Sequence, residues 1–347
     1  MIPSELSWKD SFKNGLRSIE QVNQFFNISL KEMHFDNLIP LHLAYRIKEQ
    51  GLDGILAKQF LPSNEEIADH QEDGLNDPIG DQNFSRPGQI IHRYKNRALF
   101  LPTTVCPVVC RYCFRKNELS NNDEIFKSDF QKTLEYFENH PEIEEIIFSG
   151  GDPLMLSNEK LESYLNSFSK IKHIKYIRLH SRTPISLPQR IDTGLTEVLK
   201  KYANTFETLS IAIHVNHKEE IDADVTAAMA RLREIQSLNL LSQTVLLKGI
   251  NDCPNILEDL FKKINRLGIR PYYLHHPDKV KGGMHFQLDI KAGRIIYANL
   301  RDKLPGWLIP QYVLDIPGGY GKTPLFNPEA LEFSGVLINY KSQQIKL

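Results

Sequence analysis

The chain has 347 residues, and its 42 lysine and arginine side chains nearly balance 43 aspartate and glutamate side chains. A formal net charge of −1 argues against a protein that coats nucleic acid or an anionic membrane, while 41% hydrophobic and 24% charged residues are typical of a globular protein. The sequence holds no run of about 18 apolar residues, and residues 1–11 have no basic head with an apolar core, so we expect no membrane span, no secretory signal and a reducing, cytoplasmic location.

The predicted elements fall into three stretches. Residues 1 to about 60 carry apolar side chains at helical spacing, such as Leu16, Ile19 and Val22, and residues 61–89 form a polar, irregular connector. From about residue 97, short apolar runs alternate with amphipathic stretches. The predicted strands are 98–105, 145–148, 174–179, 209–215, 243–247, 272–275 and 312–316. The predicted helices are 128–139, 158–168, 189–202, 219–236, 255–267 and 289–300.

Strands that alternate with helices predict βα units around a parallel sheet. The fold class is therefore α/β, with a full or partial (β/α) barrel as first choice and a doubly wound open sheet as second, because the pattern cannot show closure. We expect an N-terminal helical region with its connector at 1–88, a barrel domain at 89–330 and a C-terminal tail at 331–347. In such barrels the functional residues lie on loops at the carboxyl ends of the strands.

Three of the four cysteines follow the first predicted strand, at Cys106, Cys110 and Cys113. This spacing lets one loop place three thiolates around one metal centre. Structural zinc and ordinary four-iron clusters use four protein ligands, so three ligands leave one coordination position for an exogenous molecule. The alternative is a zinc-stabilised binding module in which Cys253 or a histidine is the fourth ligand.

The sequence Cys106-x-x-x-Cys110-x-x-Cys113, with Tyr112 before the last cysteine, resembles the cluster-binding motif of the radical S-adenosylmethionine (SAM) enzymes. The resemblance implies a [4Fe–4S] cluster on the three cysteines, whose unique iron binds SAM and cleaves it to a 5′-deoxyadenosyl radical. The next strand ends in a glycine pair, as the loop that contacts SAM does in that family. This loop consists of Ser149, Gly150, Gly151 and Asp152.

A second loop of interest presents Lys322 within the segment 315–324, DIPGGYGKTP. Read alone, the glycine-rich segment suggests a phosphate loop, but it lacks the glycine spacing that such a loop requires. The alternative is a solvated turn. Arginines at 93 and 97 can bind phosphate, and Arg111 and Arg115 can bind a carboxylate. Together with a presented lysine they favour a pyridoxal phosphate enzyme, in which we expect the arginines to keep the Lys322 amine neutral.

With these motifs in order, residues 88–326 resemble the lysine 2,3-aminomutase family. The matching segments are 92–94, the cysteine loop, 149–153, 181–190, 214–217, 243–252, 272–274 and the Lys322 loop. The resemblance implies that pyridoxal phosphate binds covalently to Lys322, with its phosphate among Arg93, Tyr94 and Arg97. It implies that Arg115 binds the substrate carboxylate and that Asp278 and Asp315 bind the distant ammonium of lysine. The resemblance also implies that SAM contacts Gln243 and one of two histidines, for which we choose His217 over His214.

The resemblance implies an isomerase that converts L-α-lysine into (R)-β-lysine with an external one-electron reductant. Some family members bind zinc through Cys253 and cysteines near the C-terminus, and this sequence has no cysteine after Cys253. In lacking these C-terminal cysteines, the sequence resembles the branch of the family that supplies β-lysine for the modification of translation elongation factor P. The alternative is the same reaction in free lysine metabolism. A glutamate aminomutase fits less well, because two aspartates favour a cationic side chain.

Overall fold

The computed structural model describes residues 6–31, 35–116, 130–326, 335–338 and 343–346. The first residues of the predicted helix at 128–139, parts of the predicted N-terminal helical region (1–5 and 32–34) and parts of the predicted tail (331–334, 339–342 and 347) lie outside these ranges. Among the described residues, no helix is long and apolar enough to cross a membrane.

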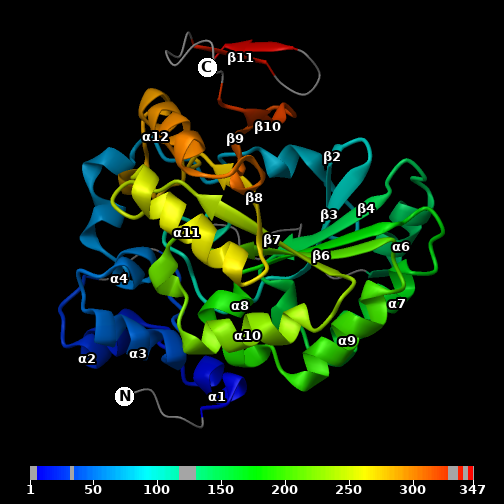
Figure 1. The fold of residues 1–347 in the computed structure, drawn as a ribbon, viewed down its shortest axis with the longest axis horizontal. Coiled ribbons are helices and arrows are strands. Elements are labelled where there is room, and N and C mark those ends of the chain that lie inside the picture. The colour runs from blue at the N-terminus through cyan, green and yellow to red at the C-terminus, as the bar shows by residue number, and fades with distance from the viewer. Residues whose placement is uncertain (1–5, 32–34, 117–129, 327–334, 339–342, 347) are drawn as a thin grey trace.

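One curled sheet organises the molecule, and its ten strands follow one another in space as they do in sequence. The strands are β1 (Ser85–Arg86), β2 (Ile90–Tyr94), β3 (Arg97–Thr103), β4 (Glu145–Gly150), β5 (Tyr176–Ser181), β6 (Thr208–His214), β7 (Leu238–Val245), β8 (Arg270–His275), β9 (Gln311–Ile316) and β10 (Gly321–Pro324). Strands β3 to β9 pair in parallel, and β1, β2 and β10 add antiparallel edges. With β1 and β10 at opposite ends of this order, the sheet is a half-barrel (Figure 1), which confirms the predicted partial (β/α) barrel.

The predicted strands are all present, and β7 departs most from its expected bounds. It begins at Leu238 rather than at residue 243 and ends at Val245. Its first half alternates buried Leu238 and Leu240 with exposed Asn239. Such alternation is typical of a half-buried strand, but it does not form the continuous apolar run on which the prediction relied.

Helices cover the outer face of the half-barrel, and most of them start at a capping side chain. They are α6 (Phe130–Glu138), α7 (Asn158–Phe168), α9 (Thr193–Ala203), α10 (Ala223–Arg233), α11 (Pro254–Arg266) and α12 (Ile290–Lys303). Ser157 caps α7 and Asp192 caps α9, each by accepting a hydrogen bond from a backbone N–H of the first turn. Helix α9 therefore begins at Thr193 rather than at residue 189, because 188–190 form a separate 3₁₀ turn.

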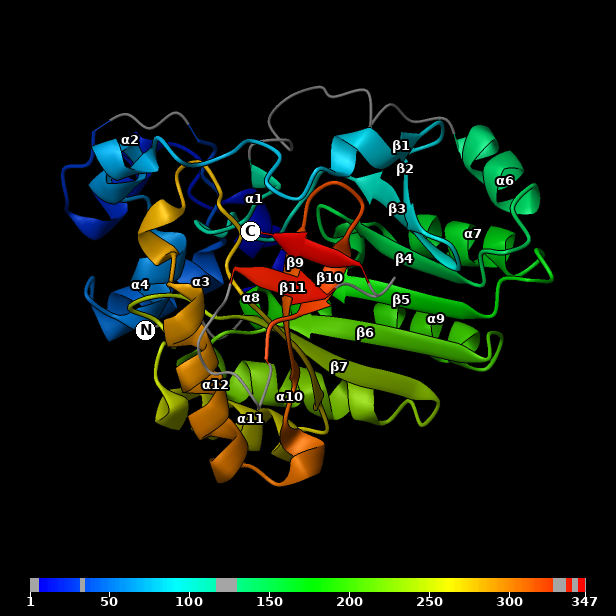
Figure 2. The ribbon, with the colours of Figure 1, turned by 90° about the horizontal axis from the view of Figure 1, so that it is seen from above.

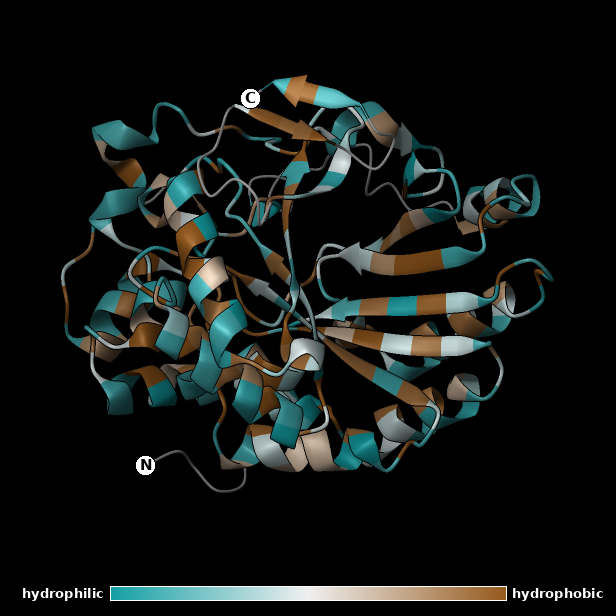
Figure 3. Cartoon of the chain, turned by 45° about the horizontal axis from the view of Figure 1, so that its top comes forward, coloured by the Kyte–Doolittle hydropathy of each residue, from teal (hydrophilic) through white to brown (hydrophobic). Residues whose placement is uncertain are grey.

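The main core lies between the sheet and these helices. The rings of Phe100 and Phe148 from the sheet meet Phe168 from α7 edge to face. Figure 3 shows the same division by hydropathy, with hydrophobic stretches along the strands and mixed colours on the helices. This packing holds the strands in register and leaves their carboxyl ends to carry the loops.

The N-terminal region forms a second core beside the half-barrel. Its helices are α1 (Trp8–Lys13), α2 (Ile19–Phe26), α3 (Leu41–Gln50) and α4 (Ile55–Phe60), which confirms the predicted helices in the described part. Figure 2 shows them on the side to which the arrowheads of the parallel strands point. Val108 of the cysteine loop packs into their apolar cluster with Phe60 and Leu43. The N-terminal helices therefore support the loop that carries the three cysteines.

The connector between these helices and the sheet contains three 3₁₀ helices, η1 (Asn64–Ile67), η2 (Asp69–Gln71) and η3 (Asp81–Phe84). Near the C-terminus, β11 (Val336–Ile338) and β12 (Gln344–Lys346) pair in antiparallel fashion, and their buried Leu337 and Ile345 join the main core. The domain boundaries at residues 88 and 330 stay predictions.

Candidate active site

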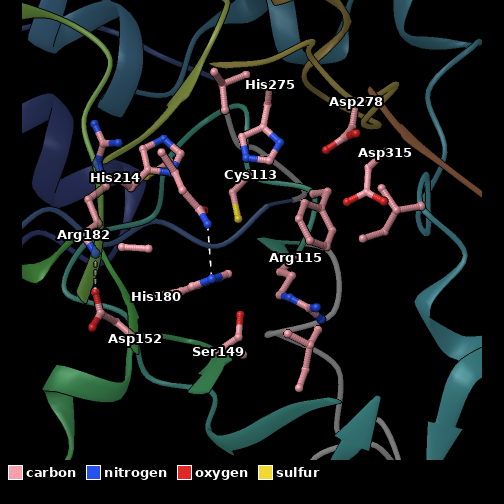
Figure 4. A pocket seen from close by; sticks show the side chains of 18 of the residues that line it. Cys113, Arg115, Ser149, Asp152, His180, Arg182, His214, His275, Asp278 and Asp315 are labelled. Carbon is pink, nitrogen blue, oxygen red and sulfur yellow. Dashed lines mark hydrogen bonds between the residues drawn. The ribbon is translucent and has the colours of Figure 1, made fainter. Parts of the chain in front are cut away.

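A cavity opens at the carboxyl ends of the parallel strands, where the barrel rule places functional loops. The predicted site residues of the cysteine loop, of the loop after β4 and of the lysine loop all line it. Two predicted residues do not, His217 and Arg111. Figure 4 shows Asp152, Arg182 and His214 on one side of the cavity, Asp278 and Asp315 on another, and Cys113 between them.

The cysteine loop, which follows β3, forms one end of this cavity. Burial raises the pKa of all three thiols, that of Cys113 to about 11, and Cys110 and Cys113 both raise the pKa of Cys106 further. The thiols are therefore near enough to act on one another electrostatically. No three potential ligands among the described residues are arranged around a single ion. An iron–sulfur cluster does not need three ligands around one ion, because each thiolate can bind a different iron atom.

Arg111 holds the cysteine loop from behind and does not bind a carboxylate ligand, so that prediction is wrong. Its Nε donates to Oε1 of Glu66 at 2.8 Å, its Nη2 also pairs with this carboxylate, and its Nη1 donates to the carbonyl of Asp36 at 2.9 Å. All of Arg111 is buried. Lys116 donates to the carbonyls of Arg111 and Gly282, and burial lowers the pKa of Lys116 to about 8. Glu66 in η1 thus ties the connector to the cysteine loop.

The loop after β4 lies directly against the start of the cysteine loop. A Cβ atom on Gly151 would stand 2.4 Å from the carbonyl oxygen of Val105, so only glycine fits. The carboxylate of Asp152 accepts hydrogen bonds from the backbone of Arg182 at 2.7 Å and of Thr183 at 2.9 Å, and from the Ser181 hydroxyl. Asp152 therefore fixes the loop after β5 against the loop after β4.

His214, rather than His217, faces the cavity. Tyr112 of the cysteine loop stacks on His214 with its hydroxyl 3.1 Å from Nε2, and burial and Arg182 lower the pKa of His214 well below its usual value. His217 instead accepts a hydrogen bond from the backbone N–H of Glu219 at the start of a 3₁₀ turn outside the cavity lining. His214, at the end of β6, is thus the histidine of the two that lines the cavity, and which of them contacts SAM stays a prediction.

Lys322 lies at the opposite end of the cavity, on β10. Its Nζ pairs with Oδ2 of Asp315, which lies directly across the β9–β10 ladder. Its backbone N–H donates to the Tyr94 hydroxyl at 2.7 Å. Gly321, at φ 64°, is required here because a Cβ atom would stand 2.4 Å from that hydroxyl.

The charge state of Lys322 differs from the sequence-based expectation. Burial lowers the pKa of Lys322, but Asp315 and Tyr94 outweigh burial and leave this pKa above its ordinary value. The Lys322 amine is therefore held as an ammonium ion by the Asp315 carboxylate, whereas we expected nearby arginines to keep this amine neutral. Arg93, the nearest of those arginines in the ion-pair network, is itself neutralised by carboxylates.

The two predicted substrate aspartates differ in their electrostatic environments. Burial raises the pKa of Asp278 to about 7, and the negative charge of Asp315 contributes to this rise. Burial also raises the pKa of Asp315, but Lys322 and Arg93 outweigh it and hold that pKa below its ordinary value. At neutral pH, Asp315 is ionised and Asp278 lies close to its titration point. This pair suits a cation that brings its own positive charge.

Arg93, predicted to bind phosphate, and Arg115, predicted to bind a carboxylate, sit in one ion-pair network. Arg93 donates from Nη1 to Asp315 at 2.8 Å and from Nη2 to Asp81 at 2.5 Å, and Arg115 donates to the other oxygen of Asp81 at 2.5 Å. The guanidinium of Arg97 lies 3.8 Å from the ring centre of Tyr94. The arginine expected at the cofactor phosphate and the arginine expected at the substrate carboxylate thus meet at Asp81, a connector residue for which the sequence predicts no role.

Neutral imidazoles form the wall between the two ends. His180 on β5 lies 3.2 Å from Gln243 on β7, and burial lowers the pKa of His180 well below its usual value. Burial lowers the pKa of His275 on β8 to about 3, and its Nε2 is buried with no hydrogen-bond partner among the described residues. Arg182 likewise has buried Nε and Nη1 atoms without a partner in the described chain. Such atoms are typical of a site that a polar ligand completes.

The donor set therefore fits the cofactors implied by the resemblance. Three thiols at one end can hold an iron–sulfur cluster, and the half-buried amine of Lys322 at the other end can bind a carbonyl cofactor. Sequence reasoning missed Glu66, Asp81, His180 and His275. Glu66 and Asp81 stand in a stretch crowded with acidic residues, and nothing local separates the buried ones from the exposed ones.

Comparison with known proteins agrees with this geometry. Residues 100–261 match the model of the Radical SAM superfamily. The chain is 35% identical to the L-lysine 2,3-aminomutases of Escherichia coli and Haemophilus influenzae, with 93% of this chain and 95% and 96% of those relatives covered. It is 34% identical to the L-lysine 2,3-aminomutase of Methanococcus maripaludis, with 92% of this chain and 76% of that relative covered.

These relatives are isomerases, and their family works with a [4Fe–4S] cluster, SAM and pyridoxal phosphate. Three thiols, a lysine amine and a buried ring of polar side chains in one cavity are what that cofactor set requires. The chain belongs to the lysine 2,3-aminomutase family of radical SAM enzymes.

Proposed function

We propose that this enzyme moves the amino group of L-lysine from C2 to C3 and forms (R)-β-lysine. One observation carries the proposal: Asp278 and Asp315 line the same cavity as Arg115, Lys322 and the three cysteines. Two carboxylates select a cationic side chain, and an arginine selects an α-carboxylate. The aminomutases named above share this substrate in their names.

We assign the cofactors to the two ends of the cavity. Cys106, Cys110 and Cys113 would hold the cluster, and Gly150, Gly151, His214 and Gln243 would line the SAM site. Lys322 would bind pyridoxal phosphate, with Arg93, Tyr94 and Arg97 beside its phosphate. When bound, these groups supply the radical and the electron-accepting ring, so that the protein contributes position and exclusion of water.

The protein's own proton chemistry centres on Lys322 Nζ. The amine must lose a proton before it can act as a nucleophile, and Oδ2 of Asp315 is the carboxylate oxygen paired with it. Because Asp315 is ionised and Lys322 carries the proton, we assign to Asp315 the role of holding the Lys322 ammonium in place until that amine gives its proton to solvent. Once Lys322 releases Asp315, the carboxylate is available to the ammonium group of the substrate. One aspartate would thus serve both the lysine of the chain and the lysine of the substrate.

We further propose that the (R)-β-lysine product serves the modification of elongation factor P. An external reductant would supply the electron for the reaction. The role in this modification is supported by the sequence resemblance to that branch. The alternative is the same reaction in free lysine metabolism. Zinc held by Cys253 gains no support, because Cys253 lies at the start of α11 and does not line the cavity with the other three cysteines.

The proposed reaction is tested with the holoenzyme. We expect protein loaded anaerobically with iron, sulfide and pyridoxal phosphate to convert L-lysine into β-lysine in the presence of SAM and a reductant. Chromatography of a chiral derivative should show the R enantiomer. L-Glutamate should give no product. Turnover of glutamate in place of lysine, or formation of the S enantiomer, would contradict the proposed specificity.

Lysine use should depend on the ionisation of Asp278. Its carboxyl group has a pKa of about 7, so it is neutral below that pH and cannot bind a cation there. We expect kcat/KM for L-lysine to fall about tenfold per pH unit below pH 7 and to level off above it. Asp278→Asn should lower the upper plateau roughly 30-fold, since losing a buried ionic partner costs about 2 kcal/mol or more.

The measurement is the pH profile of kcat/KM for both proteins at constant ionic strength. Asp278→Asn should retain its iron and its pyridoxal phosphate. If the variant shows the same fall below pH 7 as the wild-type enzyme, another group controls the profile and Asp278 does not bind the ammonium group.

A further inference from the structure

Asp81 stands between the two arginines that recognise opposite parts of the proposed ligands. Its Oδ2 accepts a hydrogen bond from Nη2 of Arg115 at 2.5 Å, and its Oδ1 accepts one from Nη2 of Arg93 at 2.5 Å. The Asp81 side chain is 2% exposed, and the Arg93 and Arg115 side chains are 6% and 5% exposed. One buried carboxylate therefore uses both oxygens to hold two buried guanidinium groups.

Several contacts fix Asp81 in this position. Its backbone N–H donates to Oδ1 of Asp77 at 3.0 Å, which anchors the start of η3. Arg93 also donates to the carbonyl of Ile79 at 2.9 Å, and its guanidinium lies 5.4 Å from the ring centre of Phe84 at the end of η3. The turn is thus held on both sides of Asp81, which fixes the backbone from which the carboxylate reaches the two arginines.

The same network reaches the other end of the substrate site. Arg93 donates from Nη1 to Oδ1 of Asp315 at 2.8 Å, and Asp315 pairs with Lys322 through its other oxygen. Arg115, Asp81, Arg93, Asp315 and Lys322 therefore alternate in charge across the cavity. The position of Arg115 relative to Asp315 sets the distance between the carboxylate and ammonium sites.

We propose that Asp81 is a positioning residue that sets substrate affinity by orienting Arg115 and Arg93. This inference deepens the proposed function and rests on it, since it takes Arg115 as the carboxylate-binding residue. A carboxylate that engages one edge of a guanidinium group fixes the plane of the whole group, because the five N–H donors are rigidly linked. Supporting contacts of this kind determine how well a binding residue is preorganised.

A competing effect has the opposite sign. If Asp81 merely occupied Arg115 until substrate arrived, its removal would free the guanidinium and tighten lysine binding. The fixed backbone of η3 and the double use of the Asp81 carboxylate favour positioning. Without Asp81, two buried guanidinium groups would lose their shared counter-ion and repel each other. We therefore expect weaker binding when the carboxylate is removed.

The test measures lysine affinity without turnover. Enzyme loaded with cluster and pyridoxal phosphate, but without SAM, is titrated with L-lysine, and the change in the cofactor absorbance gives a Kd. We expect Asp81→Asn to raise this Kd about tenfold or more, in line with the energy of a hydrogen bond between charged groups. Asp81→Glu, which keeps the charge but displaces it, should raise the Kd about threefold.

Asp73→Asn serves as the matched control, because it removes an exposed aspartate from the same connector. Its Kd should equal that of the wild-type enzyme. All variants are compared in iron content, pyridoxal phosphate content and melting temperature, so that a general structural defect is recognised. If Asp81→Asn does not fold, folded Asp81→Glu decides: a Kd equal to wild type overturns the proposal.

The remaining outcomes are also decisive. Unchanged or tighter lysine binding in folded Asp81→Asn would overturn the positioning role. If the wild-type enzyme neither binds nor converts lysine, the proposed function is rejected. If the wild-type enzyme binds lysine and the Asp81 variant binds it equally well, only this inference is rejected. Steady-state measurements should agree, with KM raised more than kcat is lowered.

Discussion

Replacing Lys322 with alanine should abolish the covalent attachment of pyridoxal phosphate and all turnover of L-lysine. Lys322 Nζ is the lysine amine that lines the described cavity at the end carrying Asp278 and Asp315. An amine is required for a covalent bond to a carbonyl cofactor, and alanine offers none. After borohydride reduction, mass spectrometry should find one modified peptide in the wild-type chain, containing Lys322, and none in the variant.

The control for this experiment is Lys279→Ala, which removes an exposed lysine next to Asp278. It should bind the cofactor as the wild-type enzyme does. Iron content should be unchanged in both variants, because the three cysteines of the loop are untouched. A reduced adduct that persists at another lysine in Lys322→Ala would move the cofactor site away from β10 and the assignments around it would fail.

An equally large effect is expected for the cysteine loop. Changing Cys106, Cys110 or Cys113 to alanine leaves two thiolates, which is too few to hold a [4Fe–4S] cluster at an open iron site. Iron should fall from about four atoms per chain to almost none, and reductive cleavage of SAM should be lost. Pyridoxal phosphate should still bind, since Lys322 and Tyr94 are untouched.

Cys253→Ala separates the two readings of the cysteines. Cys253 precedes α11 and does not line the cavity, so the variant should keep full iron content and activity. Loss of metal in Cys253→Ala, together with zinc in place of iron in the wild-type protein, would favour the zinc-stabilised binding module.

The sequence was sufficient to predict the half-barrel and the two ends of the site because these depend on local patterns. Apolar runs that alternate with amphipathic stretches indicate βα units wherever they pack. The cysteine spacing and the lysine loop are contiguous, so their chemistry can be recognised before their positions are known. Helix α7 was predicted within its observed bounds because Ser157 and the apolar spacing agree.

The errors arise where the outcome depends on contacts distant in sequence. Arg111 looks like a ligand-binding arginine, yet it pairs with Glu66, which is 45 positions away. His214 and His217 are nearly equivalent in sequence, and only the end of β6 decides which one faces the cavity. The expected neutral Lys322 overlooked Asp315, which the β9–β10 turn places directly opposite.

The connector shows the same limit most clearly. Its acidic side chains look alike in sequence. Seven residues separate Asp73 from Asp81, and only their burial in the fold distinguishes them. Asp81 is buried between two arginines, while Asp73 is exposed. Periodicity carries little information in such a segment, because its 3₁₀ helices are only three or four residues long.

The central claim is that three cysteines hold a cluster whose fourth iron is open to SAM beside the lysine-bound cofactor. Electron paramagnetic resonance of the anaerobically reduced enzyme, with and without SAM, tests it most directly. The account predicts the spectrum of a reduced [4Fe–4S] cluster that changes when SAM is added, because SAM binds the open iron. A cluster spectrum that SAM leaves unaltered, or a protein that takes up zinc and no iron, would contradict it.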